Sequence, residues 1–191
     1  MFLNQSTGAG NITFADGVPF TTGTNPYQLA AGDVDGDGKP DLAAANYTAG
    51  TVTVLRNTTP VGGPPSFVAG ATLSPGANPM GITFGDVDND GKPDLVVASY
   101  TTRQASVYRN TSSPGAVSFA TAVTFGTGAD PRKVALGDLN QDGRLDMVIL
   151  ALEADRVWVY RNDSSPGTCS FVTPATVLLA PQEARFSRES G

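Results

Sequence analysis

Histidine is absent from this chain of 191 residues, and cysteine occurs only once. These shortages argue against zinc and copper sites, which rely on imidazole and thiolate ligands. They also remove the usual groups for acid–base or triad chemistry, so we do not expect an enzyme. Cys169 has no partner for an internal disulfide and no histidine to activate it. We therefore expect Cys169 to be a small buried side chain rather than a reactive thiol.

Long apolar runs and excess positive charge are missing as well. No stretch of about 18 apolar residues occurs, so we expect no membrane insertion. The net charge of −6 argues against a nucleic-acid partner. Met1-Phe2-Leu3-Asn4 turns polar at once, and no signal peptide is visible. With 40% hydrophobic residues, the chain has enough apolar side chains for a globular core.

Three short loops hold most of the acidic residues. The first is DVDGDGKPD (33–41), the second is DVDNDGKPD (86–94) and the third is DLNQDGRLD (138–146). Oxygen ligands alternate along each loop, and a glycine at the sixth position allows a sharp turn, which suits Ca²⁺ and its roughly 6–8 oxygen ligands. We expect the seventh residue to contribute its carbonyl while its side chain points to solvent. The predicted ligands of three calcium sites are Asp33, Asp35, Asp37, Lys39 and Asp41; Asp86, Asp88, Asp90, Lys92 and Asp94; and Asp138, Asn140, Asp142, Arg144 and Asp146.

A metal-free turn, a magnesium site and an EF-hand each fit these loops less well. Asp, Asn and Gly favour turns without any metal, but 11 of the 18 acidic residues stand at the ligand positions, where they would repel one another. Mg²⁺ prefers a smaller octahedral site with several retained waters. An EF-hand needs a glutamate at the twelfth position, which is Ala44, Val97 or Ile149 here. The short apolar runs after the loops favour buried strands rather than helices.

The loops belong to a longer repeat. Asp33, Asp86 and Asp138 follow one another at intervals of 53 and 52 residues. Such a period is typical of radial and solenoid repeat architectures. In the middle repeat we predict strands over 80–86, 94–100 and 104–110, with a fourth over 67–73 or 119–125. Four antiparallel strands per unit form the blade of a β-propeller, so the predicted fold class is all-β.

The repeat resembles the FG-GAP or VCBS-type repeats of integrin α-subunits and many secreted bacterial proteins. The resemblance covers about residues 12–180 and is carried by the loop pattern D-x-D-x-D-G-x-x-D, the apolar strand that follows it, and a preceding glycine at Gly32, Gly85 or Gly137. Asn140 departs from the pattern in the third loop. The resemblance implies that each loop joins the first two strands of a blade and binds Ca²⁺. It does not imply a particular ligand, because this fold hosts many functions.

The repeat boundaries predict about three and a half blades in one partial propeller domain. Residues 1–26 would form the outer hairpin of an incomplete blade, with strands over 2–4 and 12–20. Blades follow at 27–79, 80–131 and 132–180, and residues 181–191 form a tail. Propellers typically have about four to eight blades, so we expect either a longer propeller or a homodimer that completes one.

The predicted function is a calcium-stabilised, secreted binding or adhesion module, with a lectin as the leading variant. A carbohydrate or protein ligand would contact loops 46–50, 100–104 and 152–155, where Tyr47, Tyr100 and Arg103 are suitable contacts. The alternative is a structural or self-assembling propeller piece with no ligand of its own, and a third is the non-catalytic part of a secreted hydrolase. The asparagines of six Asn-x-Ser/Thr sequences are interpreted as turn residues rather than glycan acceptors: Asn4, Asn11, Asn46, Asn57, Asn110 and Asn162.

Overall fold

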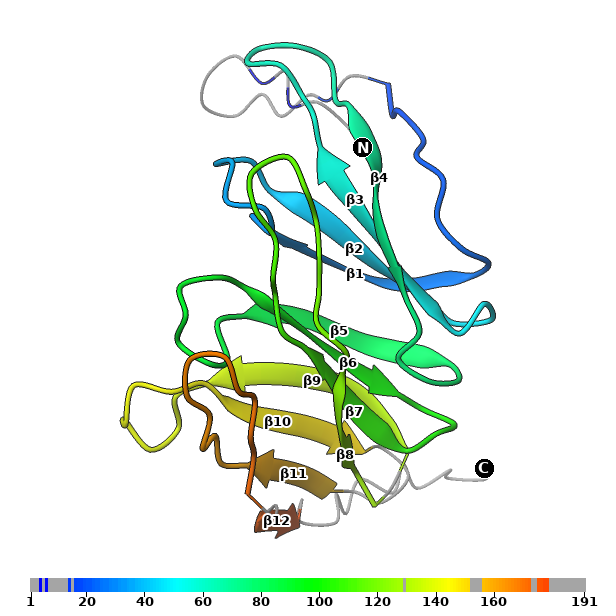
Figure 1. Ribbon diagram of the computed structural model, residues 1–191. Coiled ribbons are helices and arrows are strands. Elements are labelled where there is room, and N and C mark those ends of the chain that lie inside the picture. Colours follow the sequence, from blue (N-terminus) through cyan, green and yellow to red (C-terminus); the bar gives the residue numbers. More distant parts are fainter. Residues whose placement is uncertain are drawn as a thin grey trace, which may run out of the picture.

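The computed structural model describes residues 4, 6, 14, 16–128, 130–151 and 156–172, together with the backbone of 175–178. These residues form strands, isolated bridges and turns (Figure 1). Across the described residues, the structure contains no helix with the length and apolar character that a membrane crossing requires. The predicted all-β class is confirmed.

Three four-stranded antiparallel sheets follow one another along the chain, each with its strands in sequence order. The first contains β1 (Pro26–Gly32), β2 (Asp41–Asn46), β3 (Thr51–Asn57) and β4 (Phe67–Leu73). The second contains β5 (Pro79–Gly85), β6 (Asp94–Ser99), β7 (Gln104–Tyr108) and β8 (Val123–Gly126). The third contains β9 (Pro131–Gly137), β10 (Asp146–Ala151), β11 (Arg156–Tyr160) and β12 (Ala175–Leu178). We call these sheets blades 1, 2 and 3.

The hydrophobic core lies between the blades. Val52 and Val54 of blade 1 pack with Ile82 and Val97 of blade 2 in one cluster. The other face of blade 2 packs against blade 3 in a second cluster, which includes the buried Cys169 and confirms the expectation for that residue. Every residue of β6 is buried, because this strand has a blade on each face.

Glycines allow the blades to approach closely. A Cβ on Gly85 would lie 2.6 Å from Cδ1 of Leu136 in the next blade, and one on Gly32 would lie 3.1 Å from the Phe84 ring. Gly137 is the third member of this series, and its nearest neighbour is Leu139 of its own blade, at 3.9 Å. The glycine before each loop therefore serves blade packing where another blade follows.

The two end blades each leave one face open among the described residues. Leu29 on β1 is 57% exposed, whereas its counterparts Ile82 and Val134 are 2% and 7% exposed. At the other end, Leu139 is 57% exposed, whereas its counterparts Val34 and Val87 are 1% and 0% exposed. The three sheets stack one upon another without closing a ring (Figure 1).

The fourth strand of blade 2 is shorter than one of the two predicted alternatives. It begins at Val123, and Phe119 forms only an isolated bridge with Asn110. In blade 1, β4 starts at Phe67 and passes through a register shift that includes Gly70, where a Cβ would lie 3.1 Å from the Val54 carbonyl oxygen. Blade 2 has Ala122 at the corresponding position. Backbone pairing nevertheless continues upstream of Val123, because the Ala120 N–H donates to the Arg109 carbonyl at 2.9 Å.

The predicted N-terminal hairpin falls largely outside the described residues. Asn4 and Phe14 form an antiparallel bridge, as Asn110 and Phe119 do in blade 2. Residues 16–20 are described and are not in a strand, so this part of the strand predicted over 12–20 is wrong.

Candidate metal centres

The first aspartate of each loop organises the backbone around it. Asp33 accepts the N–H groups of residues 36, 37 and 38 at 2.9, 3.1 and 2.9 Å. Asp86 and Asp138 accept the corresponding fifth- and sixth-position N–H groups at 2.9–3.1 Å. These bonds require left-handed backbone at two positions of each loop. The sixth-position glycines have φ of 83–88°, and the fourth positions, which the ligand pattern does not single out, have φ of 74° (Gly36), 57° (Asn89) and 62° (Gln141).

Carboxylates converge in the first two loops. Asp33, Asp35 and Asp37 each bring one oxygen to within 4.8 Å of the others. Asp86, Asp88 and Asp94 do the same in the second loop. The predicted Asp41 and Asp90 lie in these loops but outside the two close groups. Such groups repel one another, and a hard cation that accepts only oxygen ligands would relieve the repulsion.

The ninth-position aspartates also clamp each blade internally. Each accepts the N–H of the second loop residue and the N–H of an asparagine that follows or ends the third strand. The two distances are 2.9 and 2.7 Å for Asp41, 3.0 and 2.7 Å for Asp94, and 3.1 and 2.8 Å for Asp146. Burial raises the pKa of Asp41, and it raises the pKa of Asp94 to about 6 despite the N–H donors. A bound cation would offset this desolvation cost.

The side chains at the seventh position reach solvent, since Lys92 is exposed and those of Lys39 and Arg144 are 39% and 33% exposed, but each also has a polar partner. Lys39 Nζ lies 3.3 Å from Asp37 and Arg144 Nη2 lies 2.9 Å from Asp142, in each case at the fifth-position carboxylate. Lys92 instead donates to the Ser112 carbonyl at 2.8 Å. The carboxylates of Asp37 and Asp142 attract the charged groups of Lys39 and Arg144, which stand two residues further along the chain. The hydrogen bond from Arg144 lowers the pKa of Asp142 to about 2.

The third loop differs from the other two. Asn140 stands at the third position, and its amide donates to Asp142 at 3.1 Å within the loop. Asp138, Asp142 and Asp146 are all described, but they do not form a close group of three. Asp138, Asn140 and Asp142 are all exposed, because no described blade covers this loop.

Sequence reasoning missed the role of three recurring asparagines. Asn57, Asn110 and Asn162 are 8%, 0% and 0% exposed. Each donates to the carbonyl of the eighth loop residue of its own blade at 2.9–3.0 Å. Buried amides with these bonds are structural groups rather than glycan acceptors. Their recurrence with the repeat was the available signal.

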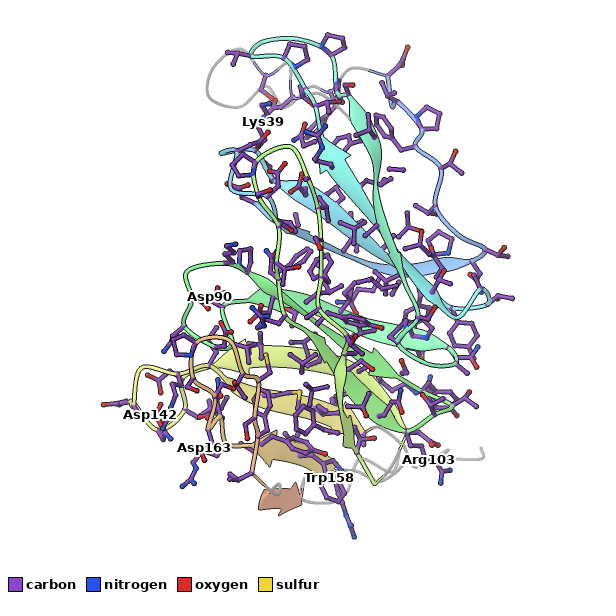
Figure 2. The ribbon with its side chains drawn as sticks, viewed as in Figure 1. Lys39, Asp90, Arg103, Asp142, Trp158 and Asp163 are labelled. Atoms are coloured by element: carbon purple, nitrogen blue, oxygen red, sulfur yellow. The ribbon has the colours of Figure 1, made fainter. Side chains whose placement is uncertain are left out.

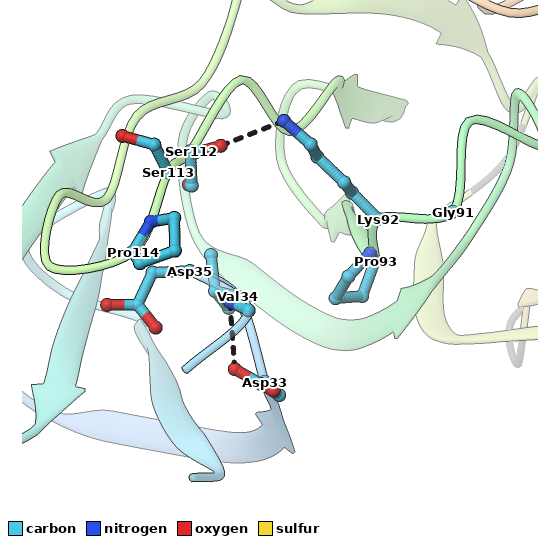
Figure 3. A pocket seen from close by; sticks show the side chains of 10 residues that line it. Asp33, Val34, Asp35, Gly91, Lys92, Pro93, Ser112, Ser113 and Pro114 are labelled. Atoms are coloured by element: carbon cyan, nitrogen blue, oxygen red, sulfur yellow. Dashed lines mark hydrogen bonds between the residues drawn. The ribbon is translucent and has the colours of Figure 1, made fainter. Parts of the chain in front are cut away.

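A pocket of about 590 Å³ lies beside the first loop. Its walls are Asp33–Gly36, the second-loop residues Gly91–Pro93, and the turn Ser112–Pro114 of blade 2 (Figure 3). At the next interface, the Asn89 side chain donates to the Gly143 carbonyl at 3.3 Å. Gly36 has no side chain to make that bridge, which keeps the first interface more open.

The loops on the opposite side are engaged with their own molecule. Figure 2 shows Lys39, Asp90 and Asp142 along one side and Arg103 on the other. Arg103 pairs with Asp130 at 2.7 Å, Tyr100 lies 4.6 Å from the Arg132 guanidinium, and Tyr47 packs against Tyr27. The predicted contact loop 152–155 lies outside the described residues.

Comparison with known proteins agrees with the fold. A solved structure of a protein from Lactobacillus plantarum is similar, with a TM-score of 0.54 and 18% sequence identity. The match covers 91% of this chain and 46% of that chain, so this chain spans less than half the length of the solved protein. No curated protein matches the chain.

The sequence profile of the FG-GAP-like repeat matches residues 1–44, 33–97 and 87–149. The matches include all three acidic loops and extend over most of the chain. The chain belongs to the FG-GAP-like repeat family.

Proposed function

We propose that the chain is a non-catalytic, calcium-stabilised binding module that works outside cells. The carboxylate groups that meet within 4.8 Å in the first two loops carry this proposal. Their all-oxygen chemistry and the left-handed turns match what Ca²⁺ requires. Three bound Ca²⁺ ions would add six positive charges to the net charge of −6. The third loop would hold the third ion, although its carboxylates are less closely gathered.

Calcium binding is tested by thermal unfolding in EDTA and in millimolar Ca²⁺. A ligand that binds only the native state adds about 2.7 kcal/mol per site at a hundredfold excess over Kd. The Tm should rise markedly with Ca²⁺, and Mg²⁺ should substitute poorly. Asp33→Ala and Asp86→Ala should each remove part of the increase. A melting curve that is the same in EDTA and in Ca²⁺ would show that the loops bind no metal.

The ligand of the module is proposed to be a carbohydrate or a protein. FG-GAP-like repeats are typical of extracellular proteins, where Ca²⁺ is plentiful. Because the Tyr47, Tyr100 and Arg103 side chains already have intramolecular contacts, the pocket at the first interface is the better place to look for a ligand. A glycan array in Ca²⁺ tests the lectin variant, and Lys92→Ala should weaken binding if the pocket is used.

Self-association is a second candidate function, favoured by the open end faces. Blade 1 exposes Tyr27 and Leu29, and blade 3 exposes Leu139 above Gly137, where an internal interface would place the next blade. These two faces correspond to the two sides of each internal interface. A second copy could therefore dock its blade 1 onto blade 3, and two such contacts would close a ring with twofold symmetry.

The mass in solution tests self-association. Light scattering in Ca²⁺ should give twice the chain mass of 19.6 kDa. Leu139→Asp should restore the monomer, because it places a charge in the proposed contact. Val61→Asp is the control, since Val61 is fully exposed on a turn of blade 1. A folded monomer of the unsubstituted protein at high concentration would exclude this candidate.

A further inference from the structure

We propose that metal occupancy in each loop controls the docking of the blade that follows it. This inference rests on the proposed calcium binding and adds a second role for the third-position aspartates. Asp35 and Asp88 each lie between a loop and a turn of the next blade. They are 3% and 1% exposed, so their acceptors are shielded from water.

The two oxygens of each aspartate face different partners. Oδ1 of Asp35 accepts the Asp37 N–H at 3.2 Å within the loop, while Oδ2 accepts the Gly115 N–H of blade 2 at 2.9 Å. The second interface repeats this arrangement. Oδ1 of Asp88 accepts the Asp90 N–H at 3.2 Å, and Oδ2 accepts the Gly167 N–H of blade 3 at 2.8 Å.

A second contact at each interface joins the same two elements. The Nδ2 group of Asn110 donates to the Val34 carbonyl at 2.8 Å, and that of Asn162 donates to the Val87 carbonyl at 2.8 Å. These carbonyls belong to the second residue of each loop, which lies between the aspartates at the first and third positions. The following blade therefore holds both a loop side chain and the loop backbone.

Physical coupling follows from this geometry. Arg56 Nη1 lies 3.8 Å from Oδ2 of Asp35 and offsets part of the repulsion among the three carboxylates of the loop. When no cation is bound, the remaining repulsion favours conformations that separate these carboxylates and weaken the bond between Oδ2 of Asp35 and the Gly115 N–H. A cation that binds the loop side of the carboxylate fixes Oδ2 toward the turn. Because coupling between binding and docking is reciprocal, loosening the turn must also weaken metal binding by the same factor.

Hydrogen exchange at two turn amides tests the coupling. Calcium should slow exchange of the Gly115 and Gly167 amides by about tenfold or more relative to EDTA. Asp37→Asn should cancel the effect at Gly115 and leave Gly167 slow, because Asp37 contacts only its own loop among the bonds described. Asp90→Asn should produce the opposite pattern. Each variant is the matched control for the other.

The effect of blade docking on metal binding is tested with Asn110→Ala. Amide shifts of Gly38 during a Ca²⁺ titration report the first loop, and its affinity should fall by about fivefold when the cross-blade hydrogen bond is lost. Asn57→Ala is the control, because it removes a hydrogen bond within one blade and none between blades. The affinity of the second loop, followed at Gly91, should not change in this variant. The Asn57 amide bonds only within blade 1 among the described residues.

The outcomes separate the two proposals. If the unsubstituted protein binds Ca²⁺ but exchange at Gly115 and Gly167 is unchanged, or if both variants affect both turns equally, the coupling is overturned and the calcium sites stand. If the unsubstituted protein binds no Ca²⁺, both proposals fail. The crossed pattern in the variants supports the coupling.

Discussion

At the residue scale, the loop aspartates could be predicted from the sequence, but the different hydrogen-bond partners of each aspartate could not. The spacing of oxygen ligands and the sixth-position glycine follow from what Ca²⁺ needs of one short loop. The clamp made by Asp94 depends on an N–H group 16 residues further along the chain. The Asp35–Gly115 bond joins residues 80 positions apart. No local pattern encodes such distances, so the roles of Asn110 and Asn162 emerged only from the fold.

The buried Asp94 carboxyl predicts an unusual pH dependence without metal. The unfolded chain releases this proton near pH 3.8, whereas the folded protein keeps it to about pH 6. Between these values the folded state binds more protons, so this group lowers the free energy of unfolding as pH rises, by about 3 kcal/mol in total. The loss is complete about one pH unit above this pKa, and Ca²⁺ should offset it because the cation requires the carboxylate form.

The carboxyl carbon shift of Asp94, followed by NMR in EDTA, measures this pKa directly. We expect a midpoint near 6, and a lower midpoint in excess Ca²⁺. Stabilisation by Ca²⁺ should accordingly be smaller at about pH 5 than at about pH 7.5. In EDTA, the exposed Asp142, whose pKa is lowered to about 2, is the reference for a carboxyl that is not buried. A midpoint for Asp94 at or below about 4 in EDTA would contradict the effect of burial.

Asn140 should make the third loop the weakest calcium site. It carries no charge at a position where the other loops have Asp35 and Asp88. Asn140→Asp should raise the affinity of this loop by at least about fivefold, because affinity follows ligand charge. Gln141→Glu is the control, since it adds the same charge one residue outside the ligand set. Equal effects of the two substitutions, measured by titration at the Gly143 amide, would show a general charge effect instead.

At the element scale, period and alternation were enough to place the strands within a few residues. The apolar runs after the loops became β2, β6 and β10, as expected. The exception is β8, which begins only at Val123, after an isolated bridge at Phe119. The glycines before the loops were recognised as part of the pattern. The reason for these glycines is the close contact with Phe84 or Leu136 of the next blade, which only the packing of the blades reveals.

Gly85→Ala and Gly137→Ala make a matched pair at this scale. The new Cβ at position 85 would lie 2.6 Å from Leu136 and 3.0 Å from Leu145. Overpacking typically costs about 1–3 kcal/mol, and the cost here should lie at the low end because both atoms are the ends of leucine side chains that can shift, so the urea midpoint should fall slightly. Gly137→Ala should be neutral or slightly stabilising in the monomer, because only Leu139 is near. Equal losses in both variants would mean that the substitution acts on strand propensity and not on the blade contact.

At the scale of the whole molecule, the core clusters join neighbouring blades. Blades 1 and 3 also meet directly, where Lys133 Nζ donates to the Gln28 side-chain oxygen at 2.9 Å. The stability of repeated units packed in this way is approximately the sum of unit and interface contributions. Blade 2 takes part in both core clusters, whereas blades 1 and 3 each take part in one. The repeat count was predictable from the period. The unequal burial of the blades depends on which faces meet, as Leu29 and Leu139 show.

The unequal burial of the three blades predicts the order in which their strands open. In Ca²⁺ and at a concentration where the chain is monomeric, the amides of β6 should exchange most slowly, and those of β2 and β10 should exchange faster because each lies in a blade with one open face. Hydrogen exchange followed by mass spectrometry can resolve the three strands. If two copies close a ring, raising the concentration should slow β2 and β10 toward the rate of β6, and Leu139→Asp should prevent that change. Equal rates for the three strands in the monomer would show that the sheet stack opens as one cooperative unit, with no weakness at its ends.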